Sequence, residues 1–215
     1  ISTDVRAPWL LAADCGEGCP PGWIVEVESL QIRRKDSQAS LSTNFDLPDF
    51  DREDGVRLTV SSRTDCLEGW EFSYTGSLEW TSVRQLNAVE LNFSPGINGI
   101  NVSAFNNAVF QRQSYRSELN SFELNRKWWG WDVIETSAGV RYIKIDENFV
   151  FNSTDAGGNT GLFRINTNNE MVGAQYGMAL SYPVGRLSAA FRLKGGLFLN
   201  SVDSDTFLRN AGVVQ

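Results

Sequence analysis

The residues with the greatest chemical capacity in this chain are carboxylates. Asp and Glu number 26 against 19 Lys and Arg, and the net charge is −7. Two carboxyl groups can hydrolyse a glycoside when one donates a proton and the other acts as base or nucleophile. Glu71 and Glu79 share one strand-like segment, but they lie eight residues apart, about 26 Å at ~3.3 Å per residue, which is too far for such a pair. No other feature selects a pair, so we expect no catalysis.

Histidine is absent and cysteine is scarce. With no His, the chain lacks the commonest general base and transition-metal ligand and every Ser-His or Cys-His nucleophile. Cys15, Cys19 and Cys66 alone make a poor zinc site. We expect a local disulfide between Cys15 and Cys19, with Cys66 as a competing partner and free buried thiols as the alternative. Because no basic stripe is present, nucleic acid is not an expected partner. No cofactor is expected either.

The segment 46–54 is dense in acidic residues. Carboxylate oxygens are the ligands that hard cations such as Ca²⁺ prefer. The spacing fits no calcium-loop template, and a solvated loop is the usual meaning of such a run. The weak calcium candidates are Asp46, Asp49, Asp51 and Asp54.

Strands must position these side chains, because apolar and polar residues alternate with a period of two. The clearest case runs for eleven residues from Trp70 to Trp80, and a tilted strand needs about 9–11 residues to cross a bilayer. The alternation predicts seven strands, near residues 23–28, 56–61, 70–80, 115–125, 134–142, 172–182 and 187–200.

One predicted strand is irregular. Within 115–125, Leu119 is out of phase with Phe122 and Leu124. A β-bulge near Asn120-Ser121 would restore the register.

The connections between the strands alternate in length. Long segments lie near 36–54, 81–113 and 146–161, and short turns lie near 63–69, 128–130 and 183–186. Long loops on one side and short turns on the other are typical of outer-membrane barrels. The sequence therefore predicts an all-β fold, an antiparallel up-and-down transmembrane β-barrel of about eight strands. Seven strands are visible, and the closing strand is either missing or an imperfect one near 207–214.

The two faces of the predicted strands differ in chemistry. The apolar face is expected to contact lipid, and the charged face is expected to line the lumen. The lumen-facing charged residues are Glu26, Glu28, Arg57, Glu71, Glu79, Glu118, Glu123, Glu135, Arg141, Arg192 and Lys194. Aromatic residues form girdles at membrane interfaces. The predicted girdle residues are Trp23, Trp70, Trp80, Trp128, Trp129, Trp131 and Tyr182.

Two parts of the chain are distinguished. Residues 1–21 are expected to form an N-terminal periplasmic segment with the Cys15/Cys19 loop, and residues 22–215 to form the barrel. No signal peptide is visible, and we interpret the sequence as a mature envelope protein. No run of about 18 apolar residues is present, which excludes a transmembrane helix. Segment 81–113 is too apolar for a solvated loop, so we expect an external hairpin, a lid over the barrel mouth or a contact for another envelope protein.

Four segments in the same order resemble the planctomycete-type outer-membrane β-barrel proteins. They are Asp49–Thr59, Ser114–Asn125, Gly139–Glu147 and Asn169–Tyr182. The resemblance covers most of the chain from about 22 to 200, and the order of the segments is stronger evidence than any one of them. It implies a barrel fold and an outer-membrane location. Family members usually continue with further strands, and the family supplies no established activity and no catalytic residues.

The expected function is a structural or surface-interaction role in the outer membrane, with extracellular long loops and periplasmic termini. In a barrel of about eight strands, side chains fill the lumen, and the charges would pair into a plug. A pore for ions or small solutes remains an alternative if ten or more strands close. A soluble β-barrel that binds an apolar ligand is the other. In that case the alternation is turned inside out, and the cavity is lined by Val172, Tyr176, Met178 and Leu180.

Overall fold

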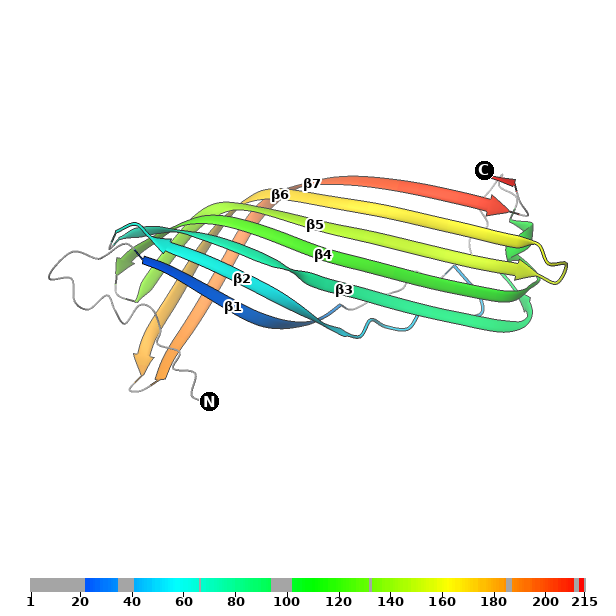
Figure 1. Cartoon of the computed structure of the whole chain (residues 1–215), viewed down its shortest axis with the longest axis horizontal. Helices are drawn as coiled ribbons and strands as arrows, with labels where there is room; N and C mark the ends of the chain where they lie inside the picture. Colours follow the sequence, from blue (N-terminus) through cyan, green and yellow to red (C-terminus); the bar gives the residue numbers. More distant parts are fainter. Residues whose placement is uncertain are drawn as a thin grey trace.

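The computed structural model describes residues 22–34, 41–65, 67–93, 102–131, 133–184, 187–210 and 213–214. They form one antiparallel sheet in which each strand pairs with the next in sequence (Figure 1). The strands are β1 (Gly22–Arg33), β2 (Arg52–Arg63), β3 (Glu68–Leu91), β4 (Ala108–Trp131), β5 (Ile134–Asp155), β6 (Thr160–Val184), β7 (Leu187–Asn210) and β8 (Val213–Val214). A 3-10 helix, η2 (Ser103–Phe105), precedes β4. The predicted all-β, antiparallel up-and-down order is confirmed.

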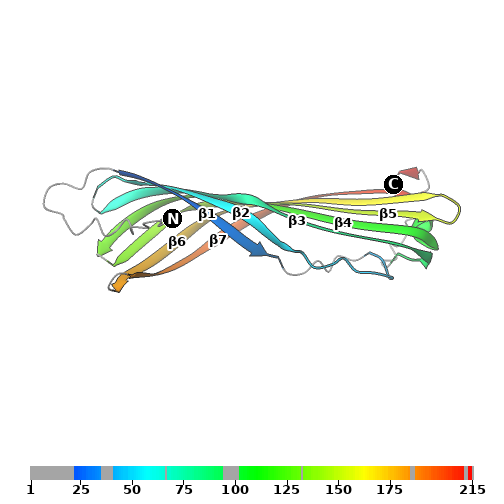
Figure 2. The ribbon, with the colours of Figure 1, turned by 60° about the horizontal axis from the view of Figure 1, so that its bottom comes forward.

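The strands run back and forth between two ends of a long, strongly twisted sheet (Figure 2). At the end here called proximal, short turns join β2 to β3, β4 to β5 and β6 to β7. At the distal end a short turn joins β5 to β6, and longer connections join β1 to β2 and β3 to β4. Within the described residues β1 and β7 do not pair with each other, so the sheet is not closed. Its described helical turn, η2, is not long and apolar enough to cross a membrane.

Strands β3 to β7 are longer than the sequence predicts, at 22 to 25 residues each. The predicted long loops near 81–113 and 146–161 are wrong, because most of both segments continues the strands. The period-two pattern persists there in the opposite phase. On β5, for example, Ile143 and Ile145 point to the same face as Arg141, and Lys144 between them points to the opposite face. The predicted connection near 36–54 does separate β1 from β2.

A β-bulge in β3 sets the phase of this sheet. Thr75 pairs with Ser121 and Leu78 pairs with Leu119, so β3 has one residue more than β4 between these points. Ser77 accommodates the extra residue with a positive φ of 59°, as bulges often require. The prediction of a bulge near Asn120-Ser121 is therefore wrong: the bulge lies in the neighbouring strand, and β4 keeps one phase from Phe110 to Trp129.

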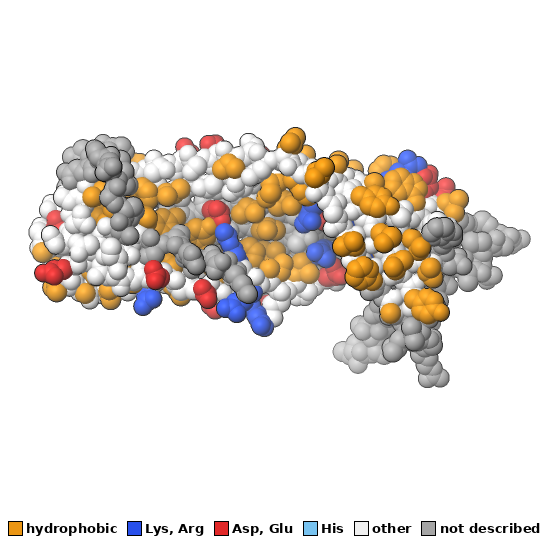
Figure 3. Space-filling view, turned by 180° about the vertical axis from the view of Figure 1, so that it is seen from behind, with side chains coloured by type: hydrophobic (Ala, Val, Ile, Leu, Met, Phe, Trp, Pro, Cys, Tyr) orange, Lys and Arg blue, Asp and Glu red, His pale blue; other side chains and the backbone are white. Residues whose placement is uncertain are grey.

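The sheet has two chemically different faces, and their character inverts along the strands. We call inner the face that carries Glu71 and Glu123, and outer the opposite face. In the proximal half the outer face is apolar, and Figure 3 shows hydrophobic side chains gathered over the proximal end. Exposed members of this apolar band are Trp23, Val25, Val27, Trp70, Phe72, Phe122, Leu124, Val140, Val172, Tyr176, Met178, Leu180, Tyr182, Phe191, Leu193, Leu197 and Leu199.

In the distal half the apolar side chains lie on the inner face and form a buried core. One cluster contains Phe50, Leu78 and Trp80. A larger one contains Leu47, Phe93, Phe105, Phe149, Phe151, Phe163 and Leu208. The outer face at the same level is polar. The distal half is therefore arranged as a water-soluble sheet, and the proximal half has the reverse arrangement.

Connecting segments cover the inner face of the distal half. Residues 41–50 lie across it, with an isolated β-bridge between Ser42 and Phe93. The Ser82 hydroxyl donates to the Pro48 carbonyl over 2.7 Å. Near η2, the Ala104 N–H donates to the Asn210 side chain over 2.8 Å. These bonds fix the connections that complete the distal core.

Candidate functional site

Charged side chains form a continuous network on the inner face of the proximal half. Lys127 Nζ lies 2.6 Å from Glu71 Oε2 and 2.9 Å from Glu135 Oε1. Lys194 Nζ lies 2.8 Å from Glu123 Oε2 and 3.4 Å from Glu71 Oε1. Each lysine therefore joins two carboxylates, and Glu71 joins the two lysines. The members of this inner network are Glu71, Glu123, Asn125, Lys127, Glu135, Arg141, Gln175 and Lys194.

The contact between Lys194 and Glu71 shows that the inner face is concave. Lys194 is on β7 and Glu71 is on β3, with three strands between them. In a flat sheet these strands would lie about 19 Å apart, at ~4.8 Å per strand. A separation of 3.4 Å between the charged atoms requires the sheet to curl around its charged face.

Two amides and a serine complete the hydrogen bonding of the inner network. Gln175 Nε2 donates to Glu123 Oε2 over 3.0 Å and to Asn125 Oδ1 over 2.7 Å. Asn125 Nδ2 donates to Glu71 over 3.4 Å. Arg141 Nε donates to the Ser121 hydroxyl over 2.9 Å and lies 3.5 Å from Glu123 Oε1. These bonds satisfy groups whose burial without partners would be costly.

The strand register explains why these residues meet. Glu123, Asn125 and Lys127 occupy alternate positions of β4 and therefore share one face. Along one row across the sheet, Lys127 pairs with Ser137, Ser137 with Gly177, and Gly177 with Lys194. A Cβ at Gly177 would lie 3.1 Å from Lys194 Cγ and 2.6 Å from Ser137 Oγ. The missing side chain lets Lys194 lie over β6 and reach the carboxylates.

The inner network balances three cations against three carboxylates, and it is largely shielded from solvent. Glu71, Glu123 and Lys127 are each 7 % exposed. Removing one member of a buried ion pair leaves an uncompensated charge and is strongly destabilising. Because every carboxylate of the inner network has a cationic partner, the arrangement is suited to holding the curled sheet together.

Nine of the eleven predicted lumen-facing residues lie on the inner face. Glu71, Glu123, Glu135, Arg141 and Lys194 meet in the inner network. Arg57 pairs with Glu28 at 3.3 Å on the same face. Glu26 and Arg192 also lie on the inner face, without an ion-pair partner among the described residues.

The lumen prediction is wrong for Glu79 and Glu118. Both lie on the outer face, where Glu79 pairs with Arg116 at 2.7 Å. The bulge at Ser77 reverses the phase of β3 and moves Glu79 outward. Glu118 faces outward because β4 has no register shift between Glu118 and Phe122.

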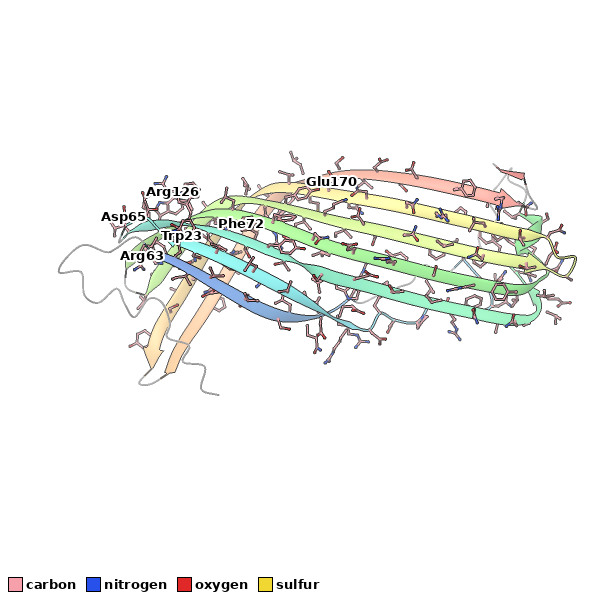
Figure 4. The ribbon with its side chains drawn as sticks, in the orientation of Figure 1. Trp23, Arg63, Asp65, Phe72, Arg126 and Glu170 are labelled. Atoms are coloured by element: carbon pink, nitrogen blue, oxygen red, sulfur yellow. The ribbon has the colours of Figure 1, made fainter. Side chains whose placement is uncertain are left out.

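The girdle prediction also divides. Trp23, Trp70, Trp128 and Tyr182 belong to the outer face near the proximal end, and Figure 4 labels Trp23 there. Arg126 lies over the rings of Trp70 and Trp128, 5.8 Å from each centroid. The side chain of Trp131 is outside the described part of the structure.

The girdle prediction is wrong for Trp80 and Trp129, which lie on the inner face. Trp80 is buried in the distal core, because the bulge turns it to the inner face. Trp129 lies on the inner face, where its indole N–H donates to Glu135 Oε2 over 3.1 Å.

A second aromatic row escaped the sequence prediction. Tyr74, Phe122 and Tyr142 stand side by side on the outer face at the distal edge of the apolar band, with ring centroids 4.9 and 6.4 Å apart. Each belongs to a different strand. Their alignment depends on the register, so alternation within one strand could not reveal it.

A partly buried cluster in the distal half was also missed. Arg34 Nη2 lies 2.6 Å from Glu147 Oε1, and the Tyr115 hydroxyl donates to the same oxygen over 2.5 Å. Burial and the hydrogen bond to Glu147 raise the pKa of Tyr115 to about 12. Burial opposes the charge of Arg34, but bonding to Glu147 outweighs it and leaves the Arg34 pKa raised. The cluster ties the chain after β1 to β4 and β5.

The calcium candidates are not gathered into a site. No group of three or more acidic or cysteine side chains among the described residues is arranged to hold a metal ion. Asp49 lies 3.8 Å from Arg33, and the Asp46 carbonyl accepts a hydrogen bond from Arg84. Cys15 and Cys19 lie outside the described residues.

The described parts of segment 81–113, residues 81–93 and 102–113, belong to the distal part of the β3–β4 hairpin. Several of its apolar residues are buried, with Leu91, Phe93 and Phe105 packed on the inner side. Its proposed contact with a partner stays a prediction.

Comparisons of this chain with family models, with curated proteins and with solved structures found no match.

Proposed function

We propose that this chain forms the wall of a β-barrel in a bacterial outer membrane, with a structural or surface-interaction role and no catalysis. The observation that carries the proposal is the inversion of polarity at one level of the sheet. Asn120, Lys144, Glu170 and Ser201 are successive partners across β4 to β7 and form a polar row. The next outer row on the proximal side consists of Phe122, Tyr142, Val172 and Leu199. Figure 4 labels Phe72 within the band and Glu170 at its edge.

The apolar band has a depth suited to a bilayer on β6 and β7, and it is two residues shorter on β5. It runs over residues 134–142 of β5, 172–182 of β6 and 189–199 of β7. Eleven residues span about 33 Å along a strand, or about 24 Å of depth at a tilt of ~45°. Outer-membrane barrels carry an apolar band about 25 Å tall. The band narrows to five residues on β1, 23–27.

The contrast between the faces supports lipid around the proximal half. Leu197 and Leu199 are 87 % and 84 % exposed, whereas Glu123 and Asn125 of the inner network, on the opposite face at the same level, are 7 % and 1 % exposed. In water this arrangement would be unfavourable, because apolar side chains would be exposed to solvent and charged ones would be buried away from it. In a bilayer the outer side chains meet acyl chains, and the aromatic rows lie at the interfaces. Because Val172 and Tyr176 point outward, this orientation favours a membrane barrel over a soluble ligand-binding one.

The distal half would stand outside the bilayer. Its polar outer face and buried inner core suit water, and residues 143–155 of β5 would reach about 40 Å beyond the band along the strand at ~3.3 Å per residue. We assign this half to the extracellular side and the short proximal turns to the periplasmic side, as in outer-membrane barrels.

A plugged interior is favoured over a pore. In the proximal half the inner network occupies the concave face. In the distal half the same face carries the aromatic core, in which Phe105 and Phe151 are fully buried. Apart from the two residues of β8, which pair with the distal end of β7, no described strand lies between β7 and β1, and further strands would have to bridge them to close the barrel. Since these two strands run in the same direction, an all-antiparallel closure needs an odd number of additional strands.

Vesicle flotation tests the proposal. The chain is refolded from denaturant in the presence of phospholipid vesicles, which are then washed with alkali and floated on a density gradient. We expect the chain to float with the lipid and to acquire β-sheet circular dichroism only when lipid or detergent is present. A chain that folds without lipid and remains in the soluble fraction would overturn the membrane assignment.

A further inference from the structure

A cavity at the proximal end of the inner face has an unusual charge balance. It is lined from β1 by Ile24 and Glu26, from β2 by Arg63, from β4 by Trp129 and from β7 by Arg192, among others. It therefore lies between the two edge strands of the curled sheet. Its volume of about 50 Å³ suits a group the size of a few water molecules, since one water needs roughly 10–15 Å³ of such space.

Two of the five charged side chains around this cavity are neutralised within the inner network. Lys127 and Glu135 lie against it, and they pair with each other at 2.9 Å. Glu135 also accepts the indole N–H of Trp129. Neither of these groups has much capacity left for a ligand.

Two arginines around the cavity form no ion pair with the described residues. Among the described residues, Arg63 and Arg192 have no carboxylate within ion-pair distance, and the Glu26 carboxylate has no cation. Arg63 lies over the Trp129 ring, 4.8 Å from its centroid. Stacking on an aromatic ring limits the freedom of a guanidinium while leaving its N–H donors available. The cavity thus presents two guanidinium groups against one carboxylate.

We propose that this cavity is a binding site for an anionic group, a carboxylate or a phosphate, held between Arg63 and Arg192. The planar guanidinium matches both groups through paired hydrogen bonds. Ile24 and the Trp129 ring supply apolar walls for the carbon skeleton of a small ligand. The site goes beyond the structural role proposed above and does not depend on membrane insertion.

The probes are inorganic phosphate and acetate, titrated by calorimetry into the full chain in a zwitterionic detergent. We expect saturable binding of at least one anion, weakened about tenfold or more by Arg192→Gln and by Arg63→Gln, because each variant removes charge-assisted hydrogen bonds to the anion. Glu26→Gln should tighten binding by removing the competing carboxylate. Arg209→Gln, at the distal end of the same strand as Arg192, is the matched control and should bind like the parent chain.

A second experiment distinguishes a lipid headgroup from a free anion as the occupant of the site. Vesicles or mixed micelles with anionic phosphatidylglycerol are compared with phosphatidylcholine alone while phosphate is titrated. Competition by the anionic lipid identifies a lipid headgroup as the occupant, and no competition identifies a free anion. Either result supports the site if the arginine variants abolish it. Absence of saturable binding, or equal binding by parent, Arg63→Gln and Arg192→Gln, overturns the proposal. Flotation of the same preparations tests the membrane assignment separately.

Discussion

Replacing Val140 by Arg distinguishes lipid from water at the outer face. Val140 is 55 % exposed on β5. It lies four residues from Lys144, which belongs to the polar row at the edge of the apolar band. That separation is about 13 Å along the strand, or about 9 Å of depth at a tilt of ~45°. A lipid-facing Arg costs about 2–4 kcal/mol at the midplane of a bilayer and about 0–1 at its interfaces. At this depth we expect a loss of about 2 kcal/mol, roughly a 30-fold change in the folding equilibrium.

Val83→Arg supplies the matched control. Val83 is an outer-face valine of β3 with 42 % exposure, but it lies beyond the boundary in the distal half. A substitution at a water-exposed position usually changes stability by less than about 0.5 kcal/mol. If the whole sheet were surrounded by water, the same limit would apply to Val140→Arg.

Guanidinium unfolding in phospholipid vesicles, followed by tryptophan fluorescence, measures the two variants against the parent chain. The slope with denaturant must stay unchanged for the difference to be a change in stability. Equal free energies of unfolding for Val140→Arg and Val83→Arg would refute a lipid-facing band. A loss confined to Val140→Arg would support it.

Three further results are expected. Lys127→Met should destabilise the chain by about 3–5 kcal/mol in denaturant titration, because it leaves Glu135 without a cation and the buried Glu71 with only the more distant Lys194. The partly exposed Lys144→Met should have little effect, and similar losses would contradict a structural role for the inner network. Since the pKa of Tyr115 is raised to about 12 in the folded chain from about 10 when unfolded, its stabilisation is complete below pH ~10 and is lost as pH rises toward 12. Tyr115→Phe should flatten that dependence in alkaline unfolding curves. Ser77→Gly should leave stability unchanged or raise it by up to about 1 kcal/mol, because glycine accepts the positive φ more readily, and a marked thermal destabilisation would argue against the bulge.

The sequence predicted the sheet because alternation is a local property. Residues i and i+2 share a face in any strand, so the seven segments, their antiparallel order and the charged character of one face follow without knowing their neighbours. The change of phase at Leu119 also reflects the structure. Its phase relative to Phe122 is correct as it stands, since β4 passes from the apolar-out half to the apolar-in half between these residues.

The polarity of each face at a given level along the strands could not be predicted in this way. The distal segments seemed to be loops because their polar residues occupy the face that is apolar elsewhere, and only pairing with neighbouring strands shows that they continue the sheet. The same limit applies to Glu79 and Trp80, which exchange faces at a bulge that one extra residue in β3 creates.

What the sequence determined by itself was therefore the presence of strands and which residues share a face within each. The tertiary structure decided which face is enclosed at each level, through the register of neighbouring strands and the curl that brings Lys194 of β7 to Glu71 of β3. Such contacts join residues more than a hundred positions apart, and no period-two pattern can encode them, because they depend on where each strand begins relative to the next.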